Sequence, residues 1–459
     1  MTSSHHRAER PTDHSRRKAS RQRRPACARP GALLLVALAA CGESRERPLP
    51  PRTGRAIPGC EGFEYQTCDI LTAGCQEELF SLAACLYGAD DPGAAPPVRQ
   101  LDEAGALALI LETSDAMAMT DGSDVMSDMA LDEAAFRAEV RGLELIGLLD
   151  PATIESPADV ADATIESLLA YYLIPTREIV IIDRGDPVSD LEANSVLAHE
   201  FVHALQDRRH DLGSVGTDVE LDSDGYLARS SLIEGEASVY QYLLMFAYQG
   251  ADVRNVNFGA FFEQLTSIGM EVTIELGSPA LTADSVFPYT FGTRYAGQRW
   301  VTGGSAGLDA VYDAPPRTSW EVLGGDVATD FADFAQAPAP LDGYTPRMDD
   351  VAGAWVSVAM LAGLDDADAV ASEWPTLTGG WRGDHLWVFD SPEAGTATLW
   401  ALEWASAEVA ARFAELAETL APEGVTLRID TSAASTRITA VERSEDLEPW
   451  RARLAEVVP

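Results

Sequence analysis

The pattern of apolar and polar positions along the chain predicts an α+β protein. A β-branched run from residue 178 to 183 is typical of a strand. A capping box at Ser189 to Glu192 then begins a segment whose apolar residues recur at helical spacing to about Arg209. A second long apolar helix is predicted from Leu232 to about Tyr248. The middle of the chain is therefore expected to be mainly helical, with a small mixed sheet.

The C-terminal pattern differs, because strands and helices alternate there over short distances. We expect a small α/β layer at 376–459, following a larger domain at 98–375. Its elements are predicted as strands at 385–389, 396–404, 425–429 and 437–441, and helices at 407–420 and 447–457.

The first forty residues have the pattern of an export signal. Arginines between Arg7 and Arg29 precede a short apolar run, and Leu38-Ala-Ala-Cys41 follows directly. Those four residues resemble the bacterial lipobox, which implies that 1–40 is a signal peptide and that Cys41 is lipidated at the mature N-terminus. The alternative is an ordinary secretory signal with a chance cysteine. Both predict an extracytoplasmic protein, and lipidation further predicts anchoring to the cell envelope, at the outer membrane or the periplasmic face.

Residues 41–59 are rich in Pro and Arg and are expected to form a tether. Four cysteines follow in a helical segment and linker at 60–97. They are Cys60, Cys68, Cys75 and Cys85. In an oxidising compartment this even number predicts two disulfides, whose pairing the sequence does not define. A thiolate metal site is the alternative, but the two close C-x-x-C pairs of zinc ribbons are missing.

The charge distribution excludes nucleic acid as an expected partner. Residues 1–40 contain nine basic and two acidic residues, among them Lys18, the only lysine. Without them 24 basic and 71 acidic residues remain, compared with 33 and 73 in the whole chain, so the net charge changes from −40 to −47. Such an acidic protein repels phosphate backbones.

The candidate chemistry lies in the first long helix, as His199-Glu200-Phe201-Val202-His203. Histidines four residues apart stand on one helix face, so both can bind one Zn²⁺. Glu200, beside the first ligand, is placed to take a proton from a metal-bound water as general base. The alternative is a helix with two buried histidines that are satisfied by hydrogen bonds.

A catalytic zinc site needs a third protein ligand and an open position. Metzincins place a third histidine six residues after the second, where this chain has Arg209, and a glycine midway, where it has Gln206. The remaining route is a glutamate on the following helix. We assign Glu234 as the third ligand, with Glu236 in reserve.

The two histidines with Glu234-Gly-Glu-Ala237 resemble the gluzincin metallopeptidases, which include thermolysin and the zinc aminopeptidases. Leu197 to Glu200, Ala204 to Asp207 and later motifs over about 165–410 also resemble a set of bacterial and archaeal lipoproteins of uncertain substrate. The resemblance implies a zincin-like fold, one Zn²⁺ per chain, and a substrate-binding edge strand, for which we take 179–182.

The same resemblance implies a side-chain donor to the reacting carbonyl oxygen. Tyr289 is our candidate and His385 its rival. One departure concerns the position four residues after the ligand glutamate, where thermolysin-like enzymes have an aspartate and this chain has Ser238. Asp207 and Glu236 are the candidates for that supporting role.

The expected function is that of an exported, lipid-anchored zinc metallopeptidase that acts on a peptide or protein substrate and contacts the membrane through its N-terminal lipid. Two alternatives remain open. One is a catalytically silent zinc-binding surface lipoprotein, and the other is a metallohydrolase for a non-peptide substrate.

Overall fold

The structure is a computed structural model. It describes residues 60, 62–63, 66–110, 133–150, 154, 156–185, 190–215, 222–276, 279–326, 331–332, 334, 336–363, 367–420, 422 and 424–458. The expected signal peptide, Cys41 and the tether lie outside these residues. The α+β prediction is confirmed, since helices are combined with one sheet of three strands and one of five.

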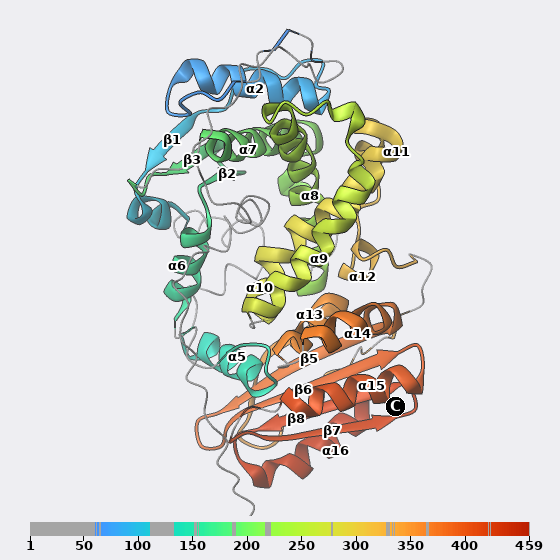
Figure 1. Ribbon diagram of the computed structural model, residues 1–459. Helices are drawn as coiled ribbons and strands as arrows, with labels where there is room; N and C mark the ends of the chain where they lie inside the picture. The colour runs from blue at the N-terminus through green and yellow to red at the C-terminus, as the bar shows by residue number, and fades with distance from the viewer. Residues whose placement is uncertain are drawn as a thin grey trace, which may run out of the picture.

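A three-stranded mixed sheet lies beside the helix of the histidine motif (Figure 1). It contains β1 (Val98–Leu101), β2 (Ala170–Leu173) and β3 (Glu178–Ile182) in the order β1-β3-β2. β3 pairs parallel with β1 and antiparallel with β2. The expectation that 179–182 forms an edge is therefore wrong. These four apolar residues are all buried, which favours the central position, and β2 is an edge strand instead.

Helices make up the rest of this part of the molecule. The two long ones are α7 (Asp190–His210) and α8 (Ser223–Tyr248), which pack against each other. The others are α2 (Ala73–Tyr87), α6 (Pro157–Ser167), η2 (Leu212–Ser214), η3 (Val253–Asn255), α9 (Phe258–Leu276), α10 (Pro279–Phe287), the π-helical turn η4 (Pro288–Gly292), α11 (Thr293–Tyr312) and α12 (Ser319–Val322). α5 (Glu133–Leu145) also precedes these long helices in the chain, but it packs against the C-terminal sheet. None of the described helices is long and apolar enough to span a bilayer.

Two disulfides stabilise the segment that covers α7. They join Cys60 to Cys85 and Cys68 to Cys75, with Cα atoms 5.8 and 5.6 Å apart. The backbone N–H of Cys68 donates to the side chain of Asn194 on α7 at 3.0 Å, and the amide of Asn194 donates back to the Cys68 carbonyl at 2.8 Å. The cross-linked segment is thus fixed to the helix that carries the histidine motif.

The C-terminal part is a five-stranded antiparallel sheet in the order β4-β5-β6-β8-β7. Its strands are β4 (Thr345–Asp350), β5 (Trp381–Ser391), β6 (Gly395–Trp404), β7 (Thr426–Ser432) and β8 (Ser435–Val441). Its helices and turns are α13 (Gly353–Ala359), η5 (Met360–Gly363), α14 (Ala367–Gly380), α15 (Ala407–Ala417), η6 (Glu418–Leu420), η7 (Ser444–Asp446) and α16 (Leu447–Val457). The alternation predicted after Trp381 is present, but the sheet also takes β4 from the region expected in the preceding domain.

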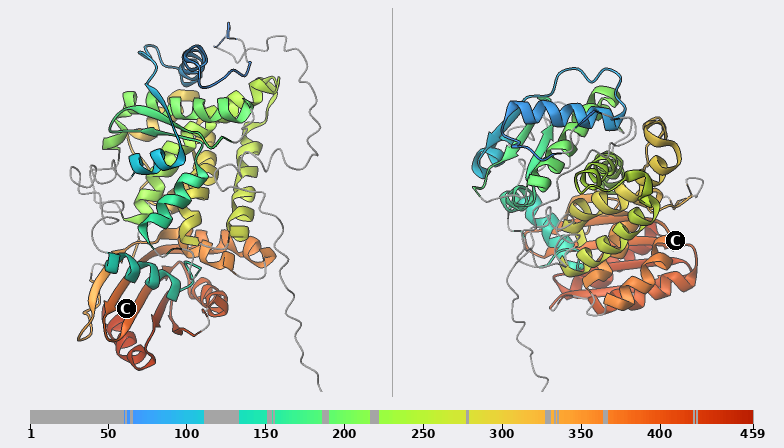
Figure 2. Two further views of the ribbon diagram at one scale, coloured as in Figure 1. Left: turned by 90° about the vertical axis from the view of Figure 1, so that its left-hand side faces the viewer. Right: turned by 45° about the horizontal axis from the view of Figure 1, so that its top comes forward.

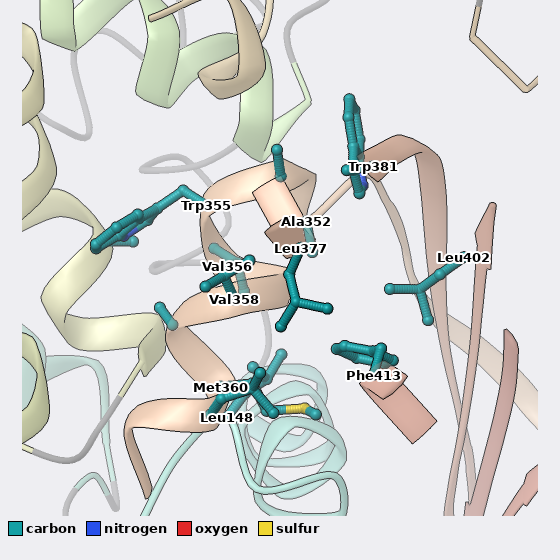
Figure 3. Packing of buried hydrophobic residues seen from close by; sticks show 14 of the residues in the cluster. Leu148, Ala352, Trp355, Val356, Val358, Met360, Leu377, Trp381, Leu402 and Phe413 are labelled. Atoms are coloured by element: carbon teal, nitrogen blue, oxygen red, sulfur yellow. The ribbon is translucent and has the colours of Figure 1, made fainter. Parts of the chain in front are cut away.

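The two faces of this sheet belong to different cores. One face packs against α5, α13 and α15, and Figure 3 shows Leu402 of β6 and Phe413 of α15 near Leu377 and Met360. The other face packs against α16 through Trp387, Phe389 and Trp450. Figure 2 shows α13 and α14 between the helical part and the sheet. The junction between the two parts is therefore a continuous apolar core.

Asp384 of β5 is the polar centre of this junction. Its carboxylate oxygens accept four hydrogen bonds, from the backbone N–H groups of Ala352 (3.0 Å) and Gly353 (2.8 Å) and from the indoles of Trp381 (3.2 Å) and Trp400 (2.8 Å). The backbone N–H of Asp224, near the start of α8, donates to Val351 in the same loop at 3.1 Å. The loop thus connects α8 to the sheet.

The pKa of Asp384 gives a test of this junction. Burial raises this pKa to about 6, against the lowering effect of its hydrogen bonds. The pKa of Asp384 is higher in the folded than in the unfolded protein, so the folded protein holds this proton more tightly. Its contribution to the free energy of unfolding is complete below about pH 4 and is lost as the pH rises through about 6. A shift of this size corresponds to about 3 kcal/mol in the free energy of unfolding.

We expect Asp384→Asn to remove this part of the pH dependence, although the variant is less stable at every pH because its amide N–H₂ faces other donors. Denaturant unfolding of both proteins between pH 4 and 7.5 measures the difference. Parallel pH profiles would contradict the prediction.

Candidate metal centre

α7 brings the two motif histidines to one point. His199 and His203 are buried, one helical turn apart, with their Nε2 atoms 3.0 Å from each other. Two ring nitrogens at this distance cannot both carry a proton directed at the other. The arrangement therefore suits a cation or a single shared proton between them.

α8 adds the third group. Oε2 of Glu234 lies 3.0 Å from Nε2 of His199 and 3.3 Å from Nε2 of His203. One ligand atom from each of the three side chains lies within 4.8 Å of the others, so the group can hold a metal ion. Two imidazole nitrogens and one carboxylate oxygen are a chemically suitable donor set. The structure thus brings together His199, His203 and Glu234, and it directs the reserve candidate Glu236 elsewhere.

The electrostatics of the three groups are strongly coupled. Burial opposes the charged form of Glu234, but the two imidazoles lower its pKa well below the usual range. Burial likewise opposes the charged form of His203, but the carboxylates of Glu234 and Glu200 raise its pKa to about 9. Positive charge is therefore favoured at the point where the three side chains meet.

Glu200 lies next to this group without being part of it. Its side chain is buried, and this burial raises its pKa above the usual value for a glutamate. The charges of both histidines and a hydrogen bond from the backbone of Tyr172 in β2 act in the opposite direction. α7 and the edge strand thus hold a carboxylate beside the metal ligands.

Tyr289 reaches the same site from the π-helical turn η4. Its ring stacks on that of His199 with centroids 6.2 Å apart, and its hydroxyl interacts with Glu234. Burial and the neighbouring carboxylates raise its pKa well above the usual value, so the phenol stays protonated and can donate a hydrogen bond. π-helical turns inside α-helices often occur at functional sites.

A close crossing of two glycines brings η4 against α8. A Cβ atom on Gly235 would lie 2.3 Å from the carbonyl group of Gly292, and one on Gly292 would lie 2.4 Å from the carbonyl oxygen of Ser231. Only glycine permits this approach. Because Gly235 follows Glu234, the crossing also sets the distance between that ligand and Tyr289.

The other candidates have different positions. His385 pairs with Asp349 and stacks on Trp387 with ring centroids 4.5 Å apart, on the C-terminal sheet. Its expected role as rival donor is therefore not supported. Asp207 accepts hydrogen bonds from the hydroxyl of Tyr172 (2.9 Å) and the backbone of Leu212 (3.1 Å), so it fixes β2 to α7 and does not reach a histidine.

Sequence reasoning missed one residue of the site. Oε1 of Gln206 lies 2.8 Å from Nδ1 of His203, and its Nε2 donates to Glu236 at 2.8 Å. The spacing of three residues from His203 on a helix was the available signal, because it places both side chains on one face. From sequence, Gln206 stood out only as the residue in place of a metzincin glycine and as part of the Ala204 to Asp207 motif, with no role of its own.

Comparison with known proteins concerns the C-terminal part. Residues 344–447 match a family described as a domain of unknown function (DUF8575). This region contains the five-stranded sheet with α13, α14 and α15, and it does not include the metal centre. The comparisons with curated proteins and with solved structures gave no match.

The glycine crossing predicts the effect of one methyl group. Gly235→Ala forces α8 and η4 apart, and we expect a loss of about 1–3 kcal/mol in the free energy of unfolding together with weaker metal binding. Gly303→Ala in α11 is the matched control, since nothing lies within 4 Å of its added Cβ. Denaturant unfolding and a metal titration measure both effects. Equal stability of the two variants would contradict the importance of the crossing.

Proposed function

We propose that the protein is a zinc-dependent peptidase. The observation that carries this proposal is the convergence of His199, His203 and Glu234 on one point, with the carboxylate of Glu200 buried beside them. Two histidines and a glutamate are the ligand set that zinc hydrolases use when one position stays open for substrate or water. A structural zinc site would instead have a fourth protein ligand, and among the described residues the group contains three.

Each nearby residue has a role that fits its position. A bound zinc ion would polarise a scissile carbonyl and make water acidic enough to attack it near neutral pH. Glu200 takes the proton that the attacking water loses and returns it to the leaving amine. The hydroxyl of Tyr289 donates to the carbonyl oxygen as negative charge develops there.

The edge strand β2 suits an extended peptide substrate. The hydrogen-bonded pairs between β2 and β3 include Leu169 with Ile182, so Ala170 and Tyr172 direct their backbone groups away from β3. The outward backbone N–H of Tyr172 donates a hydrogen bond to Glu200, so the free edge of β2 lies next to the candidate metal centre. A substrate strand beside β2 would therefore run past Glu200 and the metal ligands.

Export and anchoring are part of the same proposal. The apolar run before Cys41 and its lipobox-like sequence support lipidation at that cysteine. The two disulfides support an oxidising compartment. We therefore infer that the enzyme acts on peptides or proteins at the cell envelope.

Two variants separate metal binding from catalysis. We expect the mature wild type to bind one zinc ion per chain and to cleave members of a mixed peptide library. Glu234→Ala should lose the zinc. Glu200→Gln should keep it and cleave at least about a hundredfold more slowly, because the proton acceptor is missing. Zinc content by mass spectrometry of the metal and product analysis of the library measure the two properties.

Glu77→Gln is the matched control, because it removes one negative charge from the exposed side of α2 and should change neither property. Zinc binding without cleavage by the wild type would instead favour a silent surface lipoprotein or a hydrolase for another acyl group. Absence of zinc from the wild type would refute the proposal.

The role of Tyr289 has its own test. Tyr289→Phe keeps the ring that stacks on His199 and removes the hydroxyl, so we expect kcat to fall about a hundredfold with little change in KM or zinc content. Tyr295→Phe is the control, because its ring packs on Arg299 in α11. An unchanged kcat in Tyr289→Phe, or an equal loss in both variants, would exclude the hydroxyl as a donor.

A further inference from the structure

Gln206 connects the metal centre to a buried polar cluster between α7, α8 and α11. Its side chain is fully buried, and its Oε1 lies 2.8 Å from Nδ1 of His203. Its Nε2 donates to Oε2 of Glu236 at 2.8 Å and to the carbonyl of Ile233 at 3.0 Å. All of these groups lie behind the ligands, on the side opposite to the metal position of His203.

The surroundings of the amide determine which way it points. The backbone carbonyl of Ile233 can only accept a hydrogen bond, so the nitrogen of the amide must face it and the oxygen must face His203. Tyr312 adds to this arrangement, because its hydroxyl donates to Glu236 at 2.6 Å and lies 3.1 Å from Nε2 of Gln206. The ring of Tyr312 is itself fixed by stacking on His210 with centroids 3.7 Å apart.

An amide oxygen at Nδ1 selects one form of the imidazole. Because the amide oxygen of Gln206 can only accept, Nδ1 of His203 must carry a proton. In the neutral ring the lone pair is then on Nε2, the atom that faces His199 and Glu234. His199 has no equivalent support, since its Nδ1 is buried without a hydrogen-bond partner among the described residues. The two histidines are therefore held in different ways.

We propose that Gln206 is a positioning residue that holds His203 in the Nδ1–H tautomer, with its Nε2 directed at the metal, and that Glu236 and Tyr312 fix the orientation of the amide. This inference rests on the proposed metal site. It also gives Glu236 a function that does not involve binding the ion. An amide suits this place, because a carboxylate at position 206 would oppose that of Glu236 at hydrogen-bonding distance.

The test measures the metal-free and the metal-bound protein separately. In the metal-free wild type at about pH 10.5, above the pKa of about 9 that the neighbouring carboxylates give His203, ¹⁵N NMR of histidine-labelled protein should show the Nδ1–H tautomer of the neutral ring. Gln206→Leu, which keeps the approximate volume, should lose this preference and bind zinc about 10- to 100-fold more weakly in competition with a chelator. Tyr240→Phe is the matched control, because it removes a buried hydroxyl of α8 that bonds to Ser305 and leaves Gln206 in place.

A paired exchange gives a second line of evidence. Gln206→Glu alone places two carboxylates together and should weaken zinc binding. Combining Gln206→Glu with Glu236→Gln restores an acceptor for His203 and a donor between the two helices, so most of the affinity and the tautomer should return. If Gln206→Leu does not fold, this pair of variants decides the question.

The outcomes also separate this inference from the proposed function. An unchanged tautomer and a zinc affinity within about threefold of wild type in Gln206→Leu would overturn the positioning role, as would equal affinities in the single and the double exchange. Failure of the wild type to bind zinc would refute the metal site. The NMR measurement on metal-free protein would then still show whether Gln206 holds His203.

Discussion

The structure depends on the burial of several ionisable side chains between two packed helices. Charged groups removed from water are tolerated only when partners compensate them. Here His199, His203 and Glu234 compensate one another, and a cation would complete the compensation. Glu236, two residues after Glu234 on α8, instead accepts hydrogen bonds from Gln206 and Tyr312. The alternation of these two glutamates along α8 therefore separates the metal-facing side of the helix from its supporting side.

α8 also links this site to the C-terminal sheet. Its first residues bond to the end of β4 and to the loop that follows. Ser223 donates to Asp350, the last residue of β4, from its backbone at 2.9 Å and from its hydroxyl at 2.6 Å, and the backbone N–H of Asp224 donates to Val351 in the loop at 3.1 Å. The same loop supplies the backbone N–H groups that Asp384 accepts. The helix that carries Glu234 is thus fixed at its beginning by the region that contains the family match.

The features that depend on the pattern within a single helix or strand could be predicted from the sequence. The histidine spacing, the glutamate on the next helix and the strands after Trp381 depend on periodicity along one element, and each corresponds to an element of the structure. The positions that escaped prediction depend on partners distant in the chain. The central place of β3, the crossing of Gly235 with Gly292 and the orientation of Gln206 by Tyr312 need contacts that no single window contains. β4 was not predicted as a strand for the same reason, since its partner strand comes about 40 residues later.

The short separation between the metal ligands has a consequence for assembly. Glu234 is 35 residues from His199, and only the short segment between α7 and α8 has to close for the ligands to meet. Loop-closure entropy grows only slowly with length, so this closure costs about as much as the one that pairs β4 with β5. His199, His203 and Glu234 all precede Tyr289 in the chain, so in synthesis from the N-terminus the three residues of the candidate centre are present before the tyrosine that stacks on His199 is added.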